Sequence, residues 1–207
     1  MVYTDRASAG RALGAYLEHL RASNPLVLGL PRGGVPVAAA VREVIGGDLD
    51  VLLVRKLGVP WQPELAMGAV GEDGVRVLNP DVLAHTGVST QQVASIEARE
   101  RAELERRKQM LRGDAQPIPL EGRTVVIVDD GMATGATVVA ACRVARLHQP
   151  ARVVAAIPVA STEAMRRAEA EADEVVCPWV PRSLGGVGGA YRDFHQLGDA
   201  EVTALLC

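Results

Sequence analysis

Apolar residues follow two patterns along the chain, and together they predict strands that alternate with helices. Short unbroken apolar runs predict buried strands, and the clearest of these ends directly before Asp129. Elsewhere apolar residues recur every three or four positions, as in residues 7–21, which predicts amphipathic helices. The predicted strands are residues 26–30, 50–54, 125–128, 152–160 and 174–180, and the predicted helices are residues 7–21, 35–45, 89–112, 137–148 and 162–172.

This alternation predicts an α/β fold, a Rossmann-like and mainly parallel sheet flanked by helices on both faces. One long interval, residues 57–122, interrupts the pattern. Its first part, residues 65–79, resembles a β-hairpin, and its second part is a long charged helix that begins with a Ser89/Gln92 capping box. A chain of 207 residues is expected to form a single domain, residues 1–207, that contains this insertion.

The segment that follows the clearest strand carries the strongest chemical signal. Two adjacent carboxylates, Asp129 and Asp130, precede a loop of small and hydroxylic residues, and a helix is predicted from about Thr137. Free backbone N–H groups at a helix N-terminus favour phosphate binding. The two acids would repel a phosphate unless they face sugar hydroxyls or a divalent cation. A ribose 5-phosphate group satisfies both requirements. No Walker A or dinucleotide-binding glycine motif competes with this interpretation.

Two other predicted strands also end in residues suited to a phosphorylated ligand. Arg32, Gly33 and Gly34 follow the first strand, and Arg55 and Lys56 follow the second. Glycines allow the backbone to approach a ligand closely, and arginine offers a planar fork of donors for pyrophosphate. The alternatives are an ordinary turn for the first group and a solvated strand end for the second. Because parallel strands bind ligands beyond their carboxyl ends, these groups are expected to converge with the acid pair.

The segment from Val125 to Thr137 resembles the phosphoribosyl-pyrophosphate (PRPP) signature of the type I phosphoribosyltransferase family. The resemblance implies that Asp129 and Asp130 bind the ribose hydroxyls and act in catalysis, with a nearby loop holding the 5-phosphate. It also implies a pyrophosphate loop, often with a strained or cis peptide, to which Arg55 and Lys56 would add cations. The implied 5-phosphate residues are Met132, Ala133, Thr134, Gly135, Ala136 and Thr137, and the implied pyrophosphate loop residues are Arg32, Gly33 and Gly34.

The same resemblance implies transfer of ribose 5-phosphate from PRPP to a small-molecule acceptor, a nucleobase, with release of pyrophosphate. Mg²⁺ would arrive with PRPP, and Asp129 and Asp130 are its candidate protein ligands. A lid would lie within residues 57–122, and a hood for the base within residues 178–199. Candidates for base contacts, or alternatively for a small core of the hood, are Trp179, Tyr191 and Phe194. Members of this family are commonly dimers, so a homodimer is expected.

Composition and charge limit the partners and the cellular location that the sequence allows. A net charge of −3 argues against nucleic acid or an anionic membrane as a partner. Three cysteines without metal-ligand spacing, Cys142, Cys177 and Cys207, and the lack of an apparent signal peptide or membrane span indicate a cytoplasmic protein. Two other functions remain open at this stage: a non-catalytic PRPP sensor, and a hydrolase or phosphotransferase that acts on ribose phosphates.

Overall fold

The computed structural model describes residues 2–206, so Cys207 lies outside the described part. A five-stranded sheet forms the centre, with all neighbouring strands parallel and in the spatial order β2-β1-β6-β7-β8. This architecture confirms the predicted α/β fold. The strands of the central sheet are β1 (Leu26–Gly29), β2 (Asp48–Val51), β6 (Thr124–Val128), β7 (Arg152–Ala156) and β8 (Glu174–Val176).

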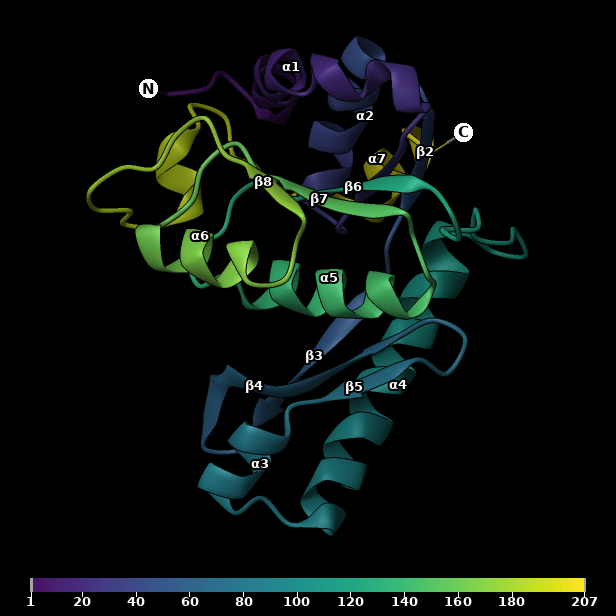
Figure 1. Cartoon of the computed structure of the whole chain (residues 1–207), viewed down its shortest axis with the longest axis vertical. Helices are drawn as coiled ribbons and strands as arrows, with labels where there is room; N and C mark the ends of the chain where they lie inside the picture. The colour runs from purple at the N-terminus through teal and green to yellow at the C-terminus, as the bar shows by residue number, and fades with distance from the viewer. Residues whose placement is uncertain (1, 207) are drawn as a thin grey trace.

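Helices cover both faces of this sheet (Figure 1). The pair α1 and α2 lies on one face, and α5 and α6 lie on the other. Beyond α5 lies a second sheet, β3-β4-β5, which is antiparallel and packs with α3 and α4. The remaining elements are α1 (Arg6–Tyr16), α2 (Gly34–Ile45), β3 (Val54–Val59), β4 (Gln62–Gly71), β5 (Arg76–Leu78), α3 (Pro80–Thr86), α4 (Thr90–Leu111), α5 (Ala136–Leu147), α6 (Thr162–Glu169), α7 (Asp199–Ala204) and the 3₁₀ segments Glu18–Ser23 and Val187–Ala190.

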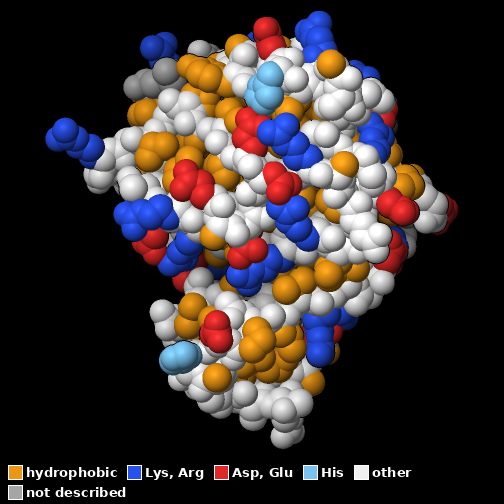
Figure 2. Space-filling model, in the orientation of Figure 1, with side chains coloured by type: hydrophobic (Ala, Val, Ile, Leu, Met, Phe, Trp, Pro, Cys, Tyr) orange, Lys and Arg blue, Asp and Glu red, His pale blue; other side chains and the backbone are white. Residues whose placement is uncertain are grey.

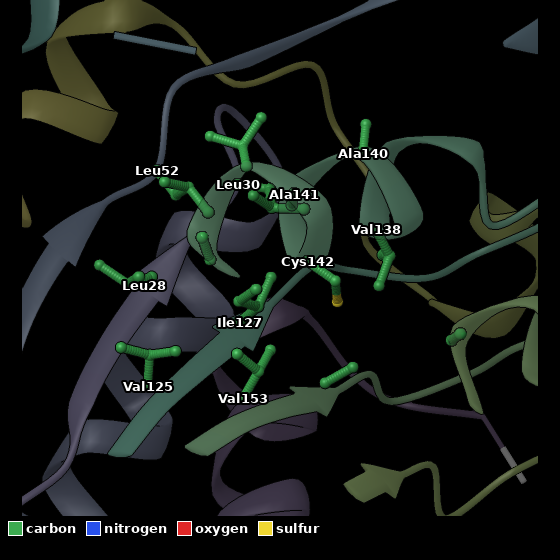
Figure 3. Close-up of a cluster of buried hydrophobic side chains, with 14 of the residues drawn as sticks. Leu28, Leu30, Leu52, Val125, Ile127, Val138, Ala140, Ala141, Cys142 and Val153 are labelled. Carbon is green, nitrogen blue, oxygen red and sulfur yellow. The ribbon is translucent and has the colours of Figure 1, made fainter. Parts of the chain in front are cut away.

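Alternation of side chains along the buried strands builds two cores from one sheet. Val126 and Val128 of β6 face α1 and α2, whereas Val125 and Ile127 face α5. Figure 3 shows the second core, in which Ile127 faces Cys142 of α5. Burial raises the pKa of the Cys142 thiol to about 12, so this cysteine is a packing residue.

The second sheet differs from the sequence prediction in one important respect. The hairpin predicted at residues 65–79 is confirmed by β4 and β5, but a third strand, β3, was not predicted. The chain leaves the central sheet after Val51 and pairs with β4 from Val54 onwards. Arg55 and Lys56 therefore lie inside an antiparallel strand and do not follow a strand of the central sheet, so that part of the prediction was wrong.

A buried charge network holds this second sheet and α4 against the central sheet. Arg112, which follows α4, has a side chain only 5% exposed. It donates to the Asp50 carboxylate of β2, to the carbonyl of Val51 at 2.6 Å, and to Glu72 in the turn after β4 at 3.2 Å. Each charge therefore has a partner, which buried charges require.

Loss of Arg112 should destabilise the fold strongly. Arg112→Met would leave Asp50 and Glu72 buried without their cation, at a cost of about 3–5 kcal/mol in the free energy of unfolding. Urea unfolding measures this value. Burial raises the pKa of Glu72, so this carboxyl becomes neutral as the pH falls. The destabilisation caused by Arg112→Met should therefore be smaller at acidic pH. Arg106→Met, which removes a solvent-exposed pair with Glu103 within α4, is the control and should change stability little.

Two surface properties are relevant to function. On the face shown in Figure 2, acidic and basic side chains are interspersed over the larger part of the molecule, without a broad region of one sign. Among residues 2–206, no helix combines the length and hydrophobicity needed to cross a lipid bilayer.

Candidate active site

The acid pair and the Arg-Gly-Gly turn lie side by side because their strands are neighbours. β1 and β6 pair in parallel, with Gly29 opposite Val128. The two chains stay together beyond the sheet, since the N–H of Leu30 donates to the carbonyl of Val128 at 2.9 Å. The predicted convergence of these two loops at the carboxyl edge of the sheet is therefore confirmed.

Asp130 is held from several directions. Its Oδ2 accepts a hydrogen bond from Nε of Arg6 at 2.8 Å, in a pair whose side chains are 10% and 14% exposed for Arg6 and Asp130. Its backbone N–H donates to Oδ1 of Asp129 at 2.9 Å, and its carbonyl accepts from the Tyr191 hydroxyl. The Arg6 hydrogen bond therefore orients the side chain, and the other two contacts hold the backbone of Asp130.

The two carboxyl groups are electrostatically costly to ionise together. Burial, and next the charge of Asp130, raise the pKa of Asp129 well above its ordinary value. Burial also raises the pKa of Asp130, against the opposing effect of the Arg6 hydrogen bond. Such a site gains most from a ligand that brings a cation or hydroxyl donors to the pair.

Glycine is required where the turn after β1 meets the acids. A Cβ atom on Gly33 would lie 2.0 Å from Oδ2 of Asp130, and one on Gly34 would lie 2.4 Å from the carbonyl oxygen of Val128. The turn also contains a cis peptide bond between Pro31 and Arg32, as the resemblance implied. The Arg32 side chain is 38% exposed and lies 3.7 Å from Asp199 of α7.

The loop after the acids leads directly into α5. Met132 is buried and bridges to Ala160, which anchors the loop to the segment after β7. Gly135 adopts a left-handed conformation with φ of 74° and precedes the first helical residue. Thr134 and Thr137 are exposed, and the Thr134 hydroxyl accepts from the N–H of Ala136 at 3.4 Å. The next N–H groups of the first turn of α5 have no partner earlier in the helix.

Arg55 and Lys56 reach this edge from the second sheet. Together with Thr137 they line a cavity of about 390 Å³ between β3, α4 and the start of α5. Nε and Nη2 of Arg55 both donate to Oε2 of Glu100, at 2.9 and 2.7 Å, and Lys56 pairs with Glu64 at 3.0 Å. Their role with pyrophosphate stays a prediction. A second cavity, of about 410 Å³, surrounds Arg112 and contains none of the predicted site residues.

The aromatic candidates form one cluster with Tyr3. Tyr191 stacks on Phe194 with ring centres 5.1 Å apart, and Tyr3 contacts both Tyr191 and Trp179. Tyr3 and Tyr191 are buried, whereas Trp179 and Phe194 are half-buried. The cluster thus has the form of a small core, and contact of its partly exposed rings with a base stays a prediction.

Two site residues were not found from the sequence. Arg6 is the first residue of α1, and nothing in its neighbourhood in the chain marks it, since its partner Asp130 lies 124 positions away. Glu100 belongs to the long charged helix predicted within residues 89–112, and the many charges of that helix lead one to expect solvated side chains. That expectation is confirmed for the exposed pair Arg106–Glu103 but is wrong for Glu100, which is buried between Arg55 and Arg99.

The donor set at the site fits Mg²⁺ that comes with a ligand better than a resident metal. Among residues 2–206, no group of three or more His, Cys, Asp or Glu side chains could enclose an ion. Asp129 and Asp130 provide carboxylate oxygens only. Mg²⁺ in phosphate sites typically uses one or two carboxylates and takes its other oxygens from water and substrate phosphates.

Comparison with known families agrees with this geometry. The model of the phosphoribosyl transferase domain matches residues 6–184. The chain therefore belongs to the phosphoribosyltransferase domain family. The match includes the acid pair, both loops and α4.

Particular relatives extend the comparison. The chain is 50% identical, over 205 residues and 99% of its length, to the Mycobacterium tuberculosis protein named "Putative phosphoribosyl transferase Rv0571c". It spans about half of that relative, 46%. The crystal structure of TT1426 from Thermus thermophilus is 45% identical with a TM-score of 0.90, covering 100% of this chain and 98% of the other. A hypoxanthine phosphoribosyltransferase from Staphylococcus aureus shares the fold, at 15% identity and a TM-score of 0.50, over 86% of this chain and 74% of that protein.

Proposed function

We propose that this domain transfers the ribose 5-phosphate group of PRPP to a nucleobase-like acceptor and releases pyrophosphate. The observation that carries the proposal is the position of the acid pair, which lies between a glycine turn suited to pyrophosphate and a helix start suited to the 5-phosphate. Each group of PRPP then has a complementary surface at one edge of the sheet.

In this proposal each part of the site has one task. Asp129 and Asp130 accept hydrogen bonds from the two ribose hydroxyls and stabilise the positive charge that develops on the ribose as pyrophosphate departs. The free amides of residues 133–135 and 137 hold the 5-phosphate. Met132, which the sequence had included, is buried and its N–H donates to the carbonyl of Val159 at 3.0 Å, so it anchors the loop and does not bind the ligand. Arg32, Arg55 and Lys56 attract the pyrophosphate, whose charge Mg²⁺ neutralises when bound. Fixing both ends of PRPP places its C1 atom for attack by the acceptor.

The acceptor site is proposed near the C-terminal segment. The carbonyl of Asp130 is tied to Tyr191, so the segment that contains the aromatic candidates lies directly beside the acid pair. Trp179 and Phe194 are the partly exposed rings there and are the proposed contacts for a planar base.

Pyrophosphate release from PRPP tests the function. The purified protein with Mg²⁺ and PRPP should release pyrophosphate only when a suitable purine or pyrimidine base is added, and mass spectrometry should detect the nucleotide. PRPP binding by calorimetry, with no release for any base, would instead favour a PRPP sensor. Release of ribose products without a base would favour a hydrolase. Absence of PRPP binding would contradict all three.

A further inference from the structure

Arg6 is the cation nearest to the proposed ribose site, and no function has yet been assigned to it. Its side chain is 10% exposed, and its Nε lies 2.8 Å from Oδ2 of Asp130. Buried arginines require partners for their donors. The partners of Arg6 lie on separate segments of the chain. This distinguishes Arg6 from the exposed arginines of the surface.

Three contacts fix the Arg6 guanidinium. Besides Asp130, its Nη1 donates to the carbonyl of His195 at 3.0 Å, and its central carbon lies 4.0 Å from the centre of the Phe194 ring. The backbone of Arg6 is also fixed, because a capping box between Asp5 and Ser8 defines the start of α1. The guanidinium thus has little freedom to leave the acid pair.

Asp130 in turn depends on Arg6 for its orientation. Its Oδ2 is the atom that a Cβ on Gly33 would meet at 2.0 Å, so this oxygen is directed towards both Gly33 and Arg6. Oδ1, the second oxygen of the same carboxylate, would lie 3.1 Å from that Cβ. With Oδ2 held by Arg6, the carboxylate plane is set, and Oδ1 is the oxygen left to meet a ligand.

We infer that Arg6 is a positioning residue of the ribose site, which orients the Asp130 carboxylate and links it to the C-terminal segment at residues 194–195. The inference rests on the proposed function, since it assigns Arg6 to the same site. In this role Arg6 acts by holding the Asp130 carboxylate in place and need not touch the substrate.

A double-mutant cycle on Mg²⁺-dependent PRPP binding tests this inference. Arg6→Gln should weaken binding by roughly 10-fold or more, the range typical of residues that orient a ligating group. Arg6→Lys keeps the positive charge but lacks the planar set of guanidinium donors. It should therefore recover part of the lost PRPP affinity. If Arg6 acts through Asp130, Arg6→Gln should have almost no further effect in an Asp130→Ala background, which removes the acceptor of the Arg6 hydrogen bond. Arg11→Gln, an exposed arginine on the same helix, is the matched control and should bind as the wild type does.

Each outcome has a distinct meaning. Equal and additive losses in the two backgrounds would assign Arg6 a general structural role and overturn the inference, as would wild-type binding by both Arg6 variants. Circular dichroism identifies a variant that fails to fold, and Arg6→Lys, which keeps the buried charge paired, then carries the test. If the wild type itself does not bind PRPP, the proposed function fails and the inference fails with it.

Discussion

Replacing Asp129 by Asn should cut turnover with PRPP by about 100-fold or more while making the domain more stable. Turnover falls because a neutral amide cannot stabilise the positive charge that the ribose develops. Stability rises because burial and the charge of Asp130 raise the pKa of Asp129, so its ionised form destabilises the fold at neutral pH. An isosteric neutral side chain removes that cost.

The pH dependence provides a second measurement of the same effect. A carboxyl whose pKa is raised on folding binds more protons in the folded state, so stability falls as pH rises above the ordinary value of 3.8 and through the folded-state pKa. Thermal unfolding of wild type and Asp129→Asn should therefore converge at acidic pH and diverge towards neutral pH.

The Asp130→Asn variant should differ in stability from the Asp129→Asn variant. It should lose activity to a similar extent, but it leaves the buried Arg6 without an ionic partner, so it should not gain the same stability. Near-normal turnover in the double variant would remove the acid pair from the mechanism. Destabilisation by Asp129→Asn at neutral pH would contradict the electrostatic argument.

Gly33→Ala should reduce activity about 100-fold while the domain stays folded. The added methyl group would lie 2.0 Å from Oδ2 of Asp130, so the carboxylate must move away from it and from Arg6. A displacement of about 1 Å in a catalytic constellation is enough to cost roughly 100-fold in rate. The steady-state rate of pyrophosphate release gives the activity, and thermal unfolding shows that the fold is kept.

A second glycine provides the control for this substitution. A Cβ on Gly189 would have nothing within 4 Å, and the residue lies in the C-terminal segment beyond the acid pair. Gly189→Ala should therefore keep both activity and stability. If Gly33→Ala turned over PRPP at the wild-type rate, close packing of this turn against Asp130 would not matter for the reaction.

The sequence predicted those features that depend on neighbours along the chain. The order of strand, acid pair, small-residue loop and helix around Asp129 is local, and the register between β1 and β6 then brings the Gly33 turn to it without further information. Parallel topology is a strong constraint, so the sequence alone places two loops at strand ends together.

The features that were missed depend on contacts between distant parts of the chain. Arg6 reaches Asp130 across 124 positions, and no periodic pattern can reveal such a pair. Arg55 was placed at a strand end because an apolar run precedes it, but pairing with β4 determines its actual strand. Glu100 has the same charged neighbours as solvated residues of α4, and its burial depends on Arg55 from another sheet.

The contacts between residues 3–6 and residues 190–195 have a consequence for synthesis. Tyr3 pairs with Tyr191, and the N–H groups of Arg192 and Asp193 donate to the carbonyls of Tyr3 and Thr4. Arg6 likewise donates to the carbonyl of His195. On the ribosome, residues 3–6 remain without these partners until residues 190–195 have been translated. The nascent domain can form the central sheet before residues 190–195 are made, but the contacts that hold Tyr3, Thr4 and Arg6 form only after those residues have been translated.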